Sequence, residues 1–456
     1  MNKKPVKYLV YIIIALFFLF YAQMRYENSL LPIPRSGFGD VGEYYKIASQ
    51  SIFSQSFWIG ERPPTIPLFF KLTGTEYGQN YDKVVTFQLL FSIVSWGVLA
   101  LTLAKITKNT IMKPISFAII LAFSLSEEII MWDYLIISES VSISLMVLFI
   151  ASSILLLEKW NALRISFLVV ISILLVGARE NFAYWLLMIG FSLLILLLVK
   201  KHIKRVLVIS VFFILLFLIS DSLASASLRW YFPLLNTISI RILPHEEHTA
   251  YLEKLGMPVT DALLERRGLA LHQGNPTMIE DPELEPFREW IKSEGKQAYI
   301  KFLWFYKAEL LQDWTQEIET VLVPDFYFYG ASKFKPIIKN LRLDEYLYPI
   351  RFGIFLFFAA NFMASAGTVW AFYERKINWV VPLLLILLSF PQLLFILSAD
   401  GNDLARHCLF YSVQLRLGVW IFILYSLDFL ISQIKTTNFY LASKATIFSF
   451  RKPAKN

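Results

Sequence analysis

The sequence predicts an all-α fold, a polytopic transmembrane helical bundle of about ten spans with a small α-helical extracytoplasmic domain. Apolar residues make up 56% of the 456-residue chain and charged residues only 17%, whereas a soluble chain carries about 25% charged residues. The apolar residues form runs of about 20 residues that are nearly free of charge, which matches the hydrocarbon thickness of a bilayer. These observations exclude a soluble globular protein.

The apolar runs place the predicted spans along the chain. They cover residues 7–24, 83–104, 112–126, 137–157, 163–178, 181–199, 206–222, 349–372, 378–397 and 408–432. The first run is too long for a secretory signal peptide and lacks a small-residue cleavage site, so we expect it to remain as a span. The single cysteine, Cys408, excludes an internal disulfide and a zinc cluster of several cysteines.

Lysine and arginine residues set the predicted orientation of the spans. They crowd the N-terminus, alternate connections and the C-terminal tail, whereas the three short connections on the other side carry only Arg179 and Arg406. Because positively charged loops stay in the cytoplasm, both termini are predicted to be cytoplasmic. The net charge of +8 therefore serves orientation, and no nucleic-acid partner is expected. We expect an integral, multi-pass protein of the plasma (inner) membrane that contacts membrane lipids.

This orientation divides the chain into three regions. Residues 1–222 are predicted to form an N-terminal transmembrane region of seven spans, with a first outer loop at 25–82. Residues 223–348 are predicted to form an extracytoplasmic helical domain. Residues 349–456 are predicted to form a C-terminal transmembrane region of three spans and a cytoplasmic tail.

Each long outer segment shows helical patterns of its own. In the first outer loop, residues 44–58 have the spacing of one amphipathic helix on the membrane surface, with its aromatic side chains facing lipid; these are Phe53, Phe57 and Trp58. Pro63 and Pro64 prevent that helix from continuing. In the outer domain, helices are predicted near 246–256, 260–271 and 283–312, with a core drawn from Trp290, Phe302, Trp304 and Phe305.

Ionisable residues gather at the predicted outer ends of the spans. An uncompensated charge at the bilayer centre costs roughly 2.5–3.5 kcal/mol, so such residues need water, a partner or a substrate. Segments far apart in sequence supply them: Asp40 and Glu43, Glu139, Arg179 and Glu180, and Asp403, Arg406 and His407. Acids and bases brought to one depth are what an active site at a membrane–water boundary requires.

The order of these motifs resembles that of the GT-C superfamily of membrane glycosyltransferases, in the branch of protein mannosyltransferases, aminoarabinose transferases and lipopolysaccharide core transferases. Those enzymes carry Asp-x-x-x-Tyr and then Arg-Pro-Pro-x-x-Pro in the first outer loop. The matching residues here are Asp40-Val-Gly-Glu-Tyr44, Arg62-Pro-Pro-Thr-Ile-Pro67, Ser138-Glu139, Arg179 and Arg406-His407. The likeness covers residues 1–200 and, more weakly, 395–420.

The resemblance implies transfer of a sugar from a polyprenyl-phosphate donor to a lipid, glycan or protein acceptor, with inversion and with an extracytoplasmic active site. Asp40 would be the catalytic base, since a carboxylate can take the proton of the attacking hydroxyl. Arg179, Arg406 and His407 would bind the donor phosphate, because guanidinium groups pair with phosphate oxygens. Glu43, Glu139, Glu180 and Arg62 would support these groups or contact the acceptor.

No cofactor is required by this chemistry, and a divalent metal ion held by Asp40 and Glu139 is left open by the resemblance. A second metal hypothesis concerns His245 and His248, which share one helix face. Surface histidines neutralised by Glu246 and Glu247 are the commoner arrangement. The two histidines are too close in sequence for the zinc-protease pattern.

Three other functions are compatible with the composition, and one of them is a receptor or assembly factor that uses the outer domain for binding. An O-antigen polymerase or ligase would act on the same lipid-linked sugars, but it does not call for an early Asp-x-x-x-Tyr motif. A transporter or flippase would need charged or broken positions at mid-span. The predicted spans are interpreted as having no charged or broken position at mid-span apart from Pro391. The sugar, the acceptor and the oligomeric state are not specified by the sequence.

Overall fold

A computed structural model describes residues 3–29, 39–74, 79, 81–197, 203–322, 343–349, 353–373, 379–399 and 401–449. Within these ranges the regular structure is entirely helical, with no strand. The predicted all-α class is therefore confirmed. Parts of both predicted outer segments, including 30–38 and 323–342, lie outside the described residues.

Six helices, or pairs of helices, in the described residues are long and apolar enough to cross a membrane. They are α1 (Lys3–Ser29), α5 (Tyr81–Ile106), α8 (Glu139–Glu158), α11 (Ile203–Ala226), α20 (Val380–Leu387) continued by α21 (Ser389–Ala399), and α22 (Leu404–Ser449).

The remaining apolar helices are bent or short. Helix α6 (Met112–Phe123) meets the segment Glu127–Tyr134, which holds α7 (Glu127–Ile130) and η1 (Met131–Tyr134), at a bend of 65°. The shorter apolar stretches are α9 (Ala162–Ala178), Asn181–Ile195 of α10 (Asn181–Leu197) and Phe355–Val369 of α19 (Gly353–Tyr373). Every predicted span thus has an apolar helix, but the count of about ten spans stays a prediction beyond these six.

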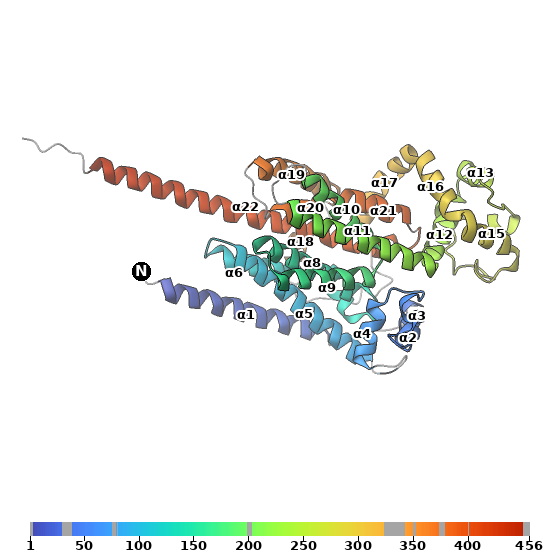
Figure 1. Cartoon of the computed structure of the whole chain (residues 1–456), viewed down its shortest axis with the longest axis horizontal. Helices are drawn as coiled ribbons and strands as arrows, with labels where there is room; N and C mark the ends of the chain where they lie inside the picture. The colour runs from blue at the N-terminus through green and yellow to red at the C-terminus, as the bar shows by residue number, and fades with distance from the viewer. Residues whose placement is uncertain are drawn as a thin grey trace, which may run out of the picture.

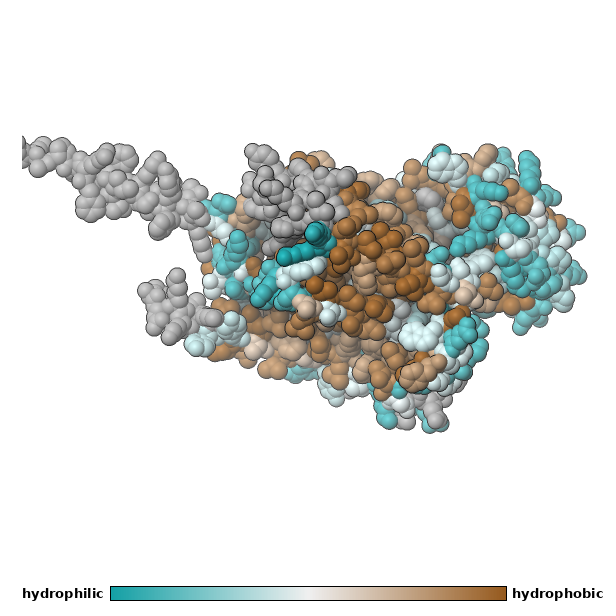
Figure 2. Space-filling model, viewed as in Figure 1, coloured by the Kyte–Doolittle hydropathy of each residue, from teal (hydrophilic) through white to brown (hydrophobic). Residues whose placement is uncertain are grey.

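The long helices run side by side along the long axis of the molecule (Figure 1). The start of α1 and the end of α22 lie at one end, and the short helices that follow α1 and α11 lie at the other. A continuous hydrophobic belt separates two more polar ends on the face shown in Figure 2. This is the surface expected of a helical bundle in a bilayer, where the apolar belt contacts lipid.

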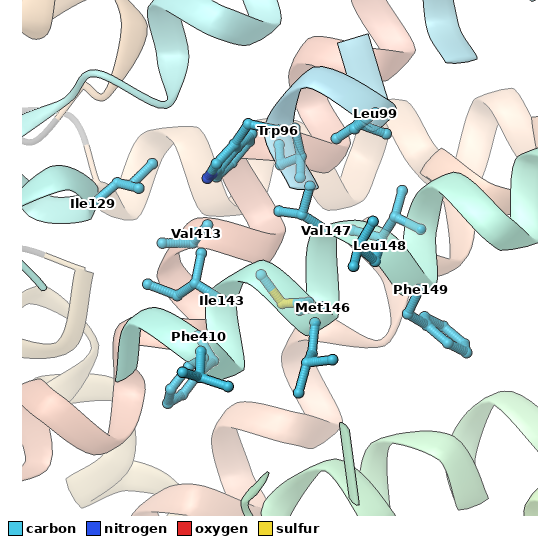
Figure 3. Close-up of a cluster of buried hydrophobic side chains, with 14 of the residues drawn as sticks. Trp96, Leu99, Ile129, Ile143, Met146, Val147, Leu148, Phe149, Phe410 and Val413 are labelled. Atoms are coloured by element: carbon cyan, nitrogen blue, oxygen red, sulfur yellow. The ribbon is translucent and has the colours of Figure 1, made fainter. Parts of the chain in front are cut away.

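Helix α8 occupies the centre of the bundle. Figure 3 shows its side chains Ile143, Met146 and Val147 beside Trp96 of α5 and Val413 of α22. Nearly every side chain of α8 is buried, including several serines. Because lipid is as apolar as these side chains, the helices associate through close packing and interhelical hydrogen bonds rather than through exclusion of water. The start of α8, which carries Glu139, is therefore held in place by its neighbours.

The segment predicted as the first outer loop, for which we keep that name, contains three short helices, α2 (Gly39–Ala48), α3 (Gln55–Trp58) and α4 (Thr65–Thr73). The predicted single amphipathic helix over 44–58 is wrong, because the chain turns between α2 and α3. The hydroxyl of Ser54 donates to the carbonyl of Ser51, and the indole of Trp58 donates to the carbonyl of Ile52. Such local bonds compete with helix formation.

The aromatic residues of this loop do not share one lipid-facing side. Phe53 is 93% exposed and Trp58 is 46% exposed, but Phe57 is only 1% exposed. Phe57 therefore packs inward, contrary to the prediction that all three face lipid.

Residues 231–305, which were predicted to lie outside the membrane and which we call the outer domain after that prediction, form a small helical unit with its own hydrophobic core. Its elements are α12 (Tyr231–Thr237), η2 (Ile238–Ile242), α13 (Glu246–Lys254), α14 (Asp261–Leu264), η3 (Pro282–Leu284), α15 (Glu285–Trp290), η4 (Ile291–Gly295) and α16 (Lys296–Phe305). The core side chains include Leu235, Leu263 and Ile291.

Several details of this domain differ from prediction. The helix expected at 260–271 is confined to α14, and the helix expected at 283–312 is interrupted at Tyr306. Trp290 and Phe302 are buried as expected. Trp304 and Phe305 do not belong to the core, since they are 74% and 64% exposed.

The end of the predicted outer segment returns into the helical bundle. Helix α17 (Lys307–Leu322) packs its last turns against α19 and α22, and α18 (Leu343–Leu347) contacts α6. Arg416, fully buried within α22, donates to the carbonyl oxygens of Leu322 and Pro349 at 2.8 and 2.9 Å. The interpretation that the spans carry no charge at mid-depth is therefore wrong for α22, where backbone carbonyls satisfy the guanidinium.

Candidate functional site

Asp40 lies in the first turn of α2, where the positive end of the helix dipole favours a carboxylate. Its Oδ1 accepts a hydrogen bond from Arg62 at 2.6 Å, and its Oδ2 accepts one from Arg406 at 3.2 Å. Burial acts to raise the pKa of Asp40, but the guanidinium groups of Arg62, Arg406 and Arg179 outweigh it and lower that pKa. Asp40 is therefore held as a carboxylate, 18% exposed.

Arg62 is positioned by the Arg-Pro-Pro segment that precedes α4. Pro63 and Pro64 fix the backbone of this segment. Helix α4 then packs closely on the end of α9, where a Cβ added at Gly177 would lie 2.5 Å from the hydroxyl of Thr65. A glycine at position 177 is thus required for this approach, which brings the Arg62 segment next to the residues that end α9.

Glu139 opens α8 and is completely buried. Its carboxylate forms an ion pair with Arg179 and lies 3.6 Å from the Nε of Arg406. A buried carboxylate is costly unless charged partners compensate it. Glu139 is therefore the anion that holds two guanidinium groups from α9 and α22 near one another.

Arg179 caps the end of α9 in an extended conformation. Besides pairing with Glu139, its guanidinium lies 3.1 Å from the Nδ1 of His407 and stacks over the ring of Phe410 at 4.8 Å. The planar guanidinium group suits this combination of an ion pair and an aromatic face.

The start of α22 supplies the last members of the cluster. Asp403 has a φ of 53°, a left-handed conformation that is uncommon for a residue with a side chain. Its carbonyl accepts from the backbone N–H groups of Arg406 and His407, and its carboxylate lies 2.9 Å from the Nε of Arg406. The preceding Gly401 packs against the carbonyl of Asn236, so the outer domain borders the cluster.

We call this set the rim cluster, and its contacts are continuous from one side chain to the next. It consists of Asp40, Arg62, Glu139, Arg179, Asp403, Arg406 and His407. The residues come from α2, the segment before α4, and the ends of α8, α9 and α22. The dispersed acids therefore contact the arginines, as we expected. The role of each residue stays a prediction.

Two predicted site residues pair elsewhere. Glu180 accepts from Arg229 at 2.7 Å, and burial raises its pKa. Glu43 lies 3.6 Å from Lys46, and burial followed by the neighbouring Glu61 raises its pKa. Neither Arg229 nor Lys46 belongs to the rim cluster.

Arg229 was not anticipated from the sequence. It also donates to the carbonyl oxygens of Gly60 and Trp58, at 2.9 and 3.0 Å. This one side chain thus joins the first outer loop, the α9–α10 turn and the start of the outer domain. The sequence signal that could have identified Arg229 is its position as a lone arginine just beyond a long apolar run.

A second ion pair missed by sequence reasoning is linked to the rim cluster through Ser140. Arg25 and Asp133 are both buried, with 3.3 Å between Nη2 and Oδ2. Arg25 also donates to the hydroxyls of Tyr21 and Ser92 at 2.9 and 2.7 Å. Ser140, the neighbour of Glu139, donates to Asp133 at 2.7 Å. The pair therefore supports the turn that delivers Glu139.

In the part of the chain that the structure describes, no three side chains of His, Cys, Asp or Glu gather as metal ligands would. Asp40 and Glu139 both face guanidinium groups, so a metal held by these two finds no support in the geometry. His248 is buried rather than on the surface, contrary to prediction, and its Nε2 lies 3.0 Å from Glu309. His245 is exposed.

No model of a known protein family matches the chain, and no curated protein compared with it does. What the chain does is therefore argued from the rim cluster and from the chemistry of its groups.

Proposed function

We propose that the chain is a GT-C-type glycosyltransferase that moves a sugar from a polyprenyl-phosphate donor to an acceptor on the outer face of the membrane. The observation that carries the proposal is the contact between Asp40, in the first outer loop, and Arg406, at the start of the last long helix. An acid from one end of the chain and a base from the other meet where α8 and α9 add Glu139 and Arg179. The site would lie at the outer end of the apolar belt.

The proposed reaction uses these groups as follows. The hydroxyl oxygen of the acceptor attacks the anomeric carbon and forms the new C–O bond, and its proton passes to the carboxylate of Asp40. The bond between the anomeric carbon and the phosphate oxygen breaks, and the electron pair leaves with the lipid phosphate. Arg406 and Arg179 bind the charge on that phosphate through paired N–H groups. Because the step is a single displacement, the anomeric configuration inverts.

The ion pairs of Asp40 suggest how phosphate binding and proton transfer are coupled. A carboxylate held by two guanidinium groups has a lowered pKa and is a weak base. A lipid phosphate that binds Arg406 competes with Asp40 for the same N–H groups. The carboxylate then loses part of its stabilisation and gains basicity only when the donor is present. This arrangement would keep the base inactive in the empty site.

The test is direct analysis of the product. Mass spectrometry of envelope lipids and glycans is compared between cells with the chain, cells without it and cells with Asp40→Asn. The proposal expects one glycan to lack a sugar in both deficient strains. Unchanged glycans, together with altered uptake of a small solute, would favour a transporter and overturn the proposal.

A polymerase or ligase of lipid-linked glycans is separated by the size of the product. Loss of one sugar unit supports the proposed transferase, whereas loss of a whole polysaccharide from its lipid anchor supports the ligase. Purified protein in vesicles adds a second measure, because Arg406→Gln should weaken binding of polyprenyl phosphate in the absence of any acceptor.

A further inference from the structure

The outer domain carries an exposed aromatic and basic face on α16. Ile300, Trp304 and Phe305 are 58%, 74% and 64% exposed. Ile300 and Trp304, four residues apart, share the side away from the buried Phe302. Phe305 borders this side and stacks one face of its ring on Tyr251 of α13, with 4.7 Å between the ring centroids. Lys301 is exposed on the same side, and the ammonium of Lys307 lies over the ring of Trp304 at 4.1 Å. Residues 296–308 contain three lysines and no acidic residue.

Two contacts place α16 at the level where the candidate spans end. The ammonium of Lys296 lies 3.8 Å from Asp221, in the last turns of α11. The hydroxyl of Tyr299 donates to the carbonyl of Ser398 at 2.6 Å, next to the last residue of α21. Both partners sit at the domain end of their spans, and α16 lies there beside the bundle in Figure 1.

The helix to which α16 is tied faces outward. Only 22% of the apolar window of α11 is buried within the protein, and its exposed side chains include Leu215, Leu218 and Ile219. Because this surface would contact lipid tails, the contacts of Lys296 with α11 and of Tyr299 with α21 hold α16 at the height of the lipid headgroups. Aromatic side chains with adjacent lysines are typical of that layer.

We propose that the face formed by Ile300, Lys301, Trp304, Phe305 and Lys307 is an interfacial anchor that inserts into the outer leaflet of a bilayer with anionic headgroups. The aromatic rings enter the boundary between headgroups and acyl chains, and the lysines bind lipid phosphates. The outer domain is thereby fixed against the membrane beside the rim cluster. This inference does not depend on the proposed activity.

The experiment uses the full chain in vesicles of phosphatidylcholine and phosphatidylglycerol. Cys408→Ala removes the single cysteine, and Ile300→Cys then carries a bimane label on the proposed anchor. A matched label at Glu253→Cys reports an exposed position on α13, outside the proposed face. The expected result is strong quenching of the label at 300, but not at 253, by lipids brominated near the ester end of the acyl chain.

Three outcomes would overturn the proposal. Equal emission of the label at 300 in brominated and ordinary vesicles would place this face in water. Excimer emission from pyrene labels at 300 would assign the face to a second copy of the chain. Unchanged quenching after Lys301→Glu with Lys307→Glu would remove the match to anionic headgroups, because charge reversal should lift the label toward water.

Discussion

Asp40 and Arg406 are 366 residues apart in the sequence and 3.2 Å apart in the structure. Neither belongs to a structural core, yet each is held by further partners, Asp40 by Arg62 and Arg406 by Asp403. The side chains of Arg406 and Asp40 are only 15% and 18% exposed, and such an ion pair is a weak argument for stability, because the cost of removing both charges from water offsets much of their attraction. The contact is better explained by function, and the first two predictions test it.

Asp40→Asn should separate donor binding from transfer. Loss of a positioned base is expected to slow transfer by about 10²–10⁴-fold. Binding of polyprenyl phosphate should persist or tighten, because the substitution removes a carboxylate that competes for Arg62 and Arg406. Initial rates and lipid-phosphate binding are measured on purified protein in vesicles.

The matched control for this prediction is Glu27→Gln, an acid-to-amide change at the exposed end of α1, where Glu27 accepts a hydrogen bond from Gln23. It should leave both quantities unchanged. Normal transfer by Asp40→Asn would remove Asp40 from the base role. Loss of lipid-phosphate binding would instead show that the carboxylate contributes to the donor site.

The pH dependence of transfer should report the partners of Asp40. Because guanidinium groups lower its pKa, the carboxylate stays ionised through neutral pH and is protonated only below the ordinary aspartate value of about 3.9. Any stability from these pairs is therefore present above that ordinary value and is lost as pH falls through the lowered one. Arg62→Gln removes one lowering charge, so the acid limb of kcat/KM should move to higher pH.

Lys46→Gln is the control for the pH profile. Lys46 lies on α2 near Asp40 in sequence, but it pairs with Glu43 and Glu61. Its substitution should leave the acid limb in place. An acid limb that does not respond to Arg62→Gln would show that protonation of Asp40 does not limit the reaction.

The helices and the sidedness of the charges could be predicted because they follow from local pattern. Runs of apolar residues specify helices whatever their neighbours, and ionisable residues at the ends of these runs must lie near one depth. The partners could not be predicted in the same way. Arg179 and Glu180 are adjacent, yet Arg179 joins Glu139 while Glu180 joins Arg229. The extended backbone at Arg179 sends neighbouring side chains to opposite sides.

Buried ion pairs were missed for a related reason. Arg25 lies just past the end of the first predicted span and resembles an ordinary flanking charge. Only the packing of α1 against α5 and α6 reveals that it faces Asp133 and Ser92 rather than water. Likewise, Phe57 and Trp304 have exchanged the expected inside and outside positions, because each short helix is oriented by tertiary contacts that its own spacing does not specify.

Gly177→Ala tests the packing that places Arg62. The added Cβ would lie 2.5 Å from the hydroxyl oxygen of Thr65 but 3.6 Å from its Cβ. We expect the substitution to push α4 away from α9 and so to reduce transfer. The free energy of unfolding should fall by about 1–3 kcal/mol, which is typical of overpacking.

Thr65→Ala removes the colliding oxygen and should restore the double variant to near the stability of Thr65→Ala alone. Transfer should recover with it if the effect on Arg62 is one of position. A double variant as impaired as Gly177→Ala would mean that the glycine is needed for another reason.

The buried pair of Arg25 and Asp133 yields the last prediction. Removing one partner leaves the other as an uncompensated buried charge, at a cost of about 3–5 kcal/mol. Arg25→Ala and Asp133→Ala should each lower the unfolding temperature in detergent. Cys408 is the single cysteine and is buried, so its reaction with a thiol-reactive dye on heating measures unfolding without an introduced label.

The double variant Arg25→Met with Asp133→Leu distinguishes charge imbalance from a general loss of packing. It removes both charges at similar volume, so it should be more stable than either alanine variant. Lys105→Ala, which breaks the partly exposed pair with Glu158, is the surface control and should cost no more than about 1 kcal/mol. If the double variant were less stable than both single variants, the hydrogen bonds to Ser92 and Ser140 would outweigh the ion pair in holding the turn before Glu139.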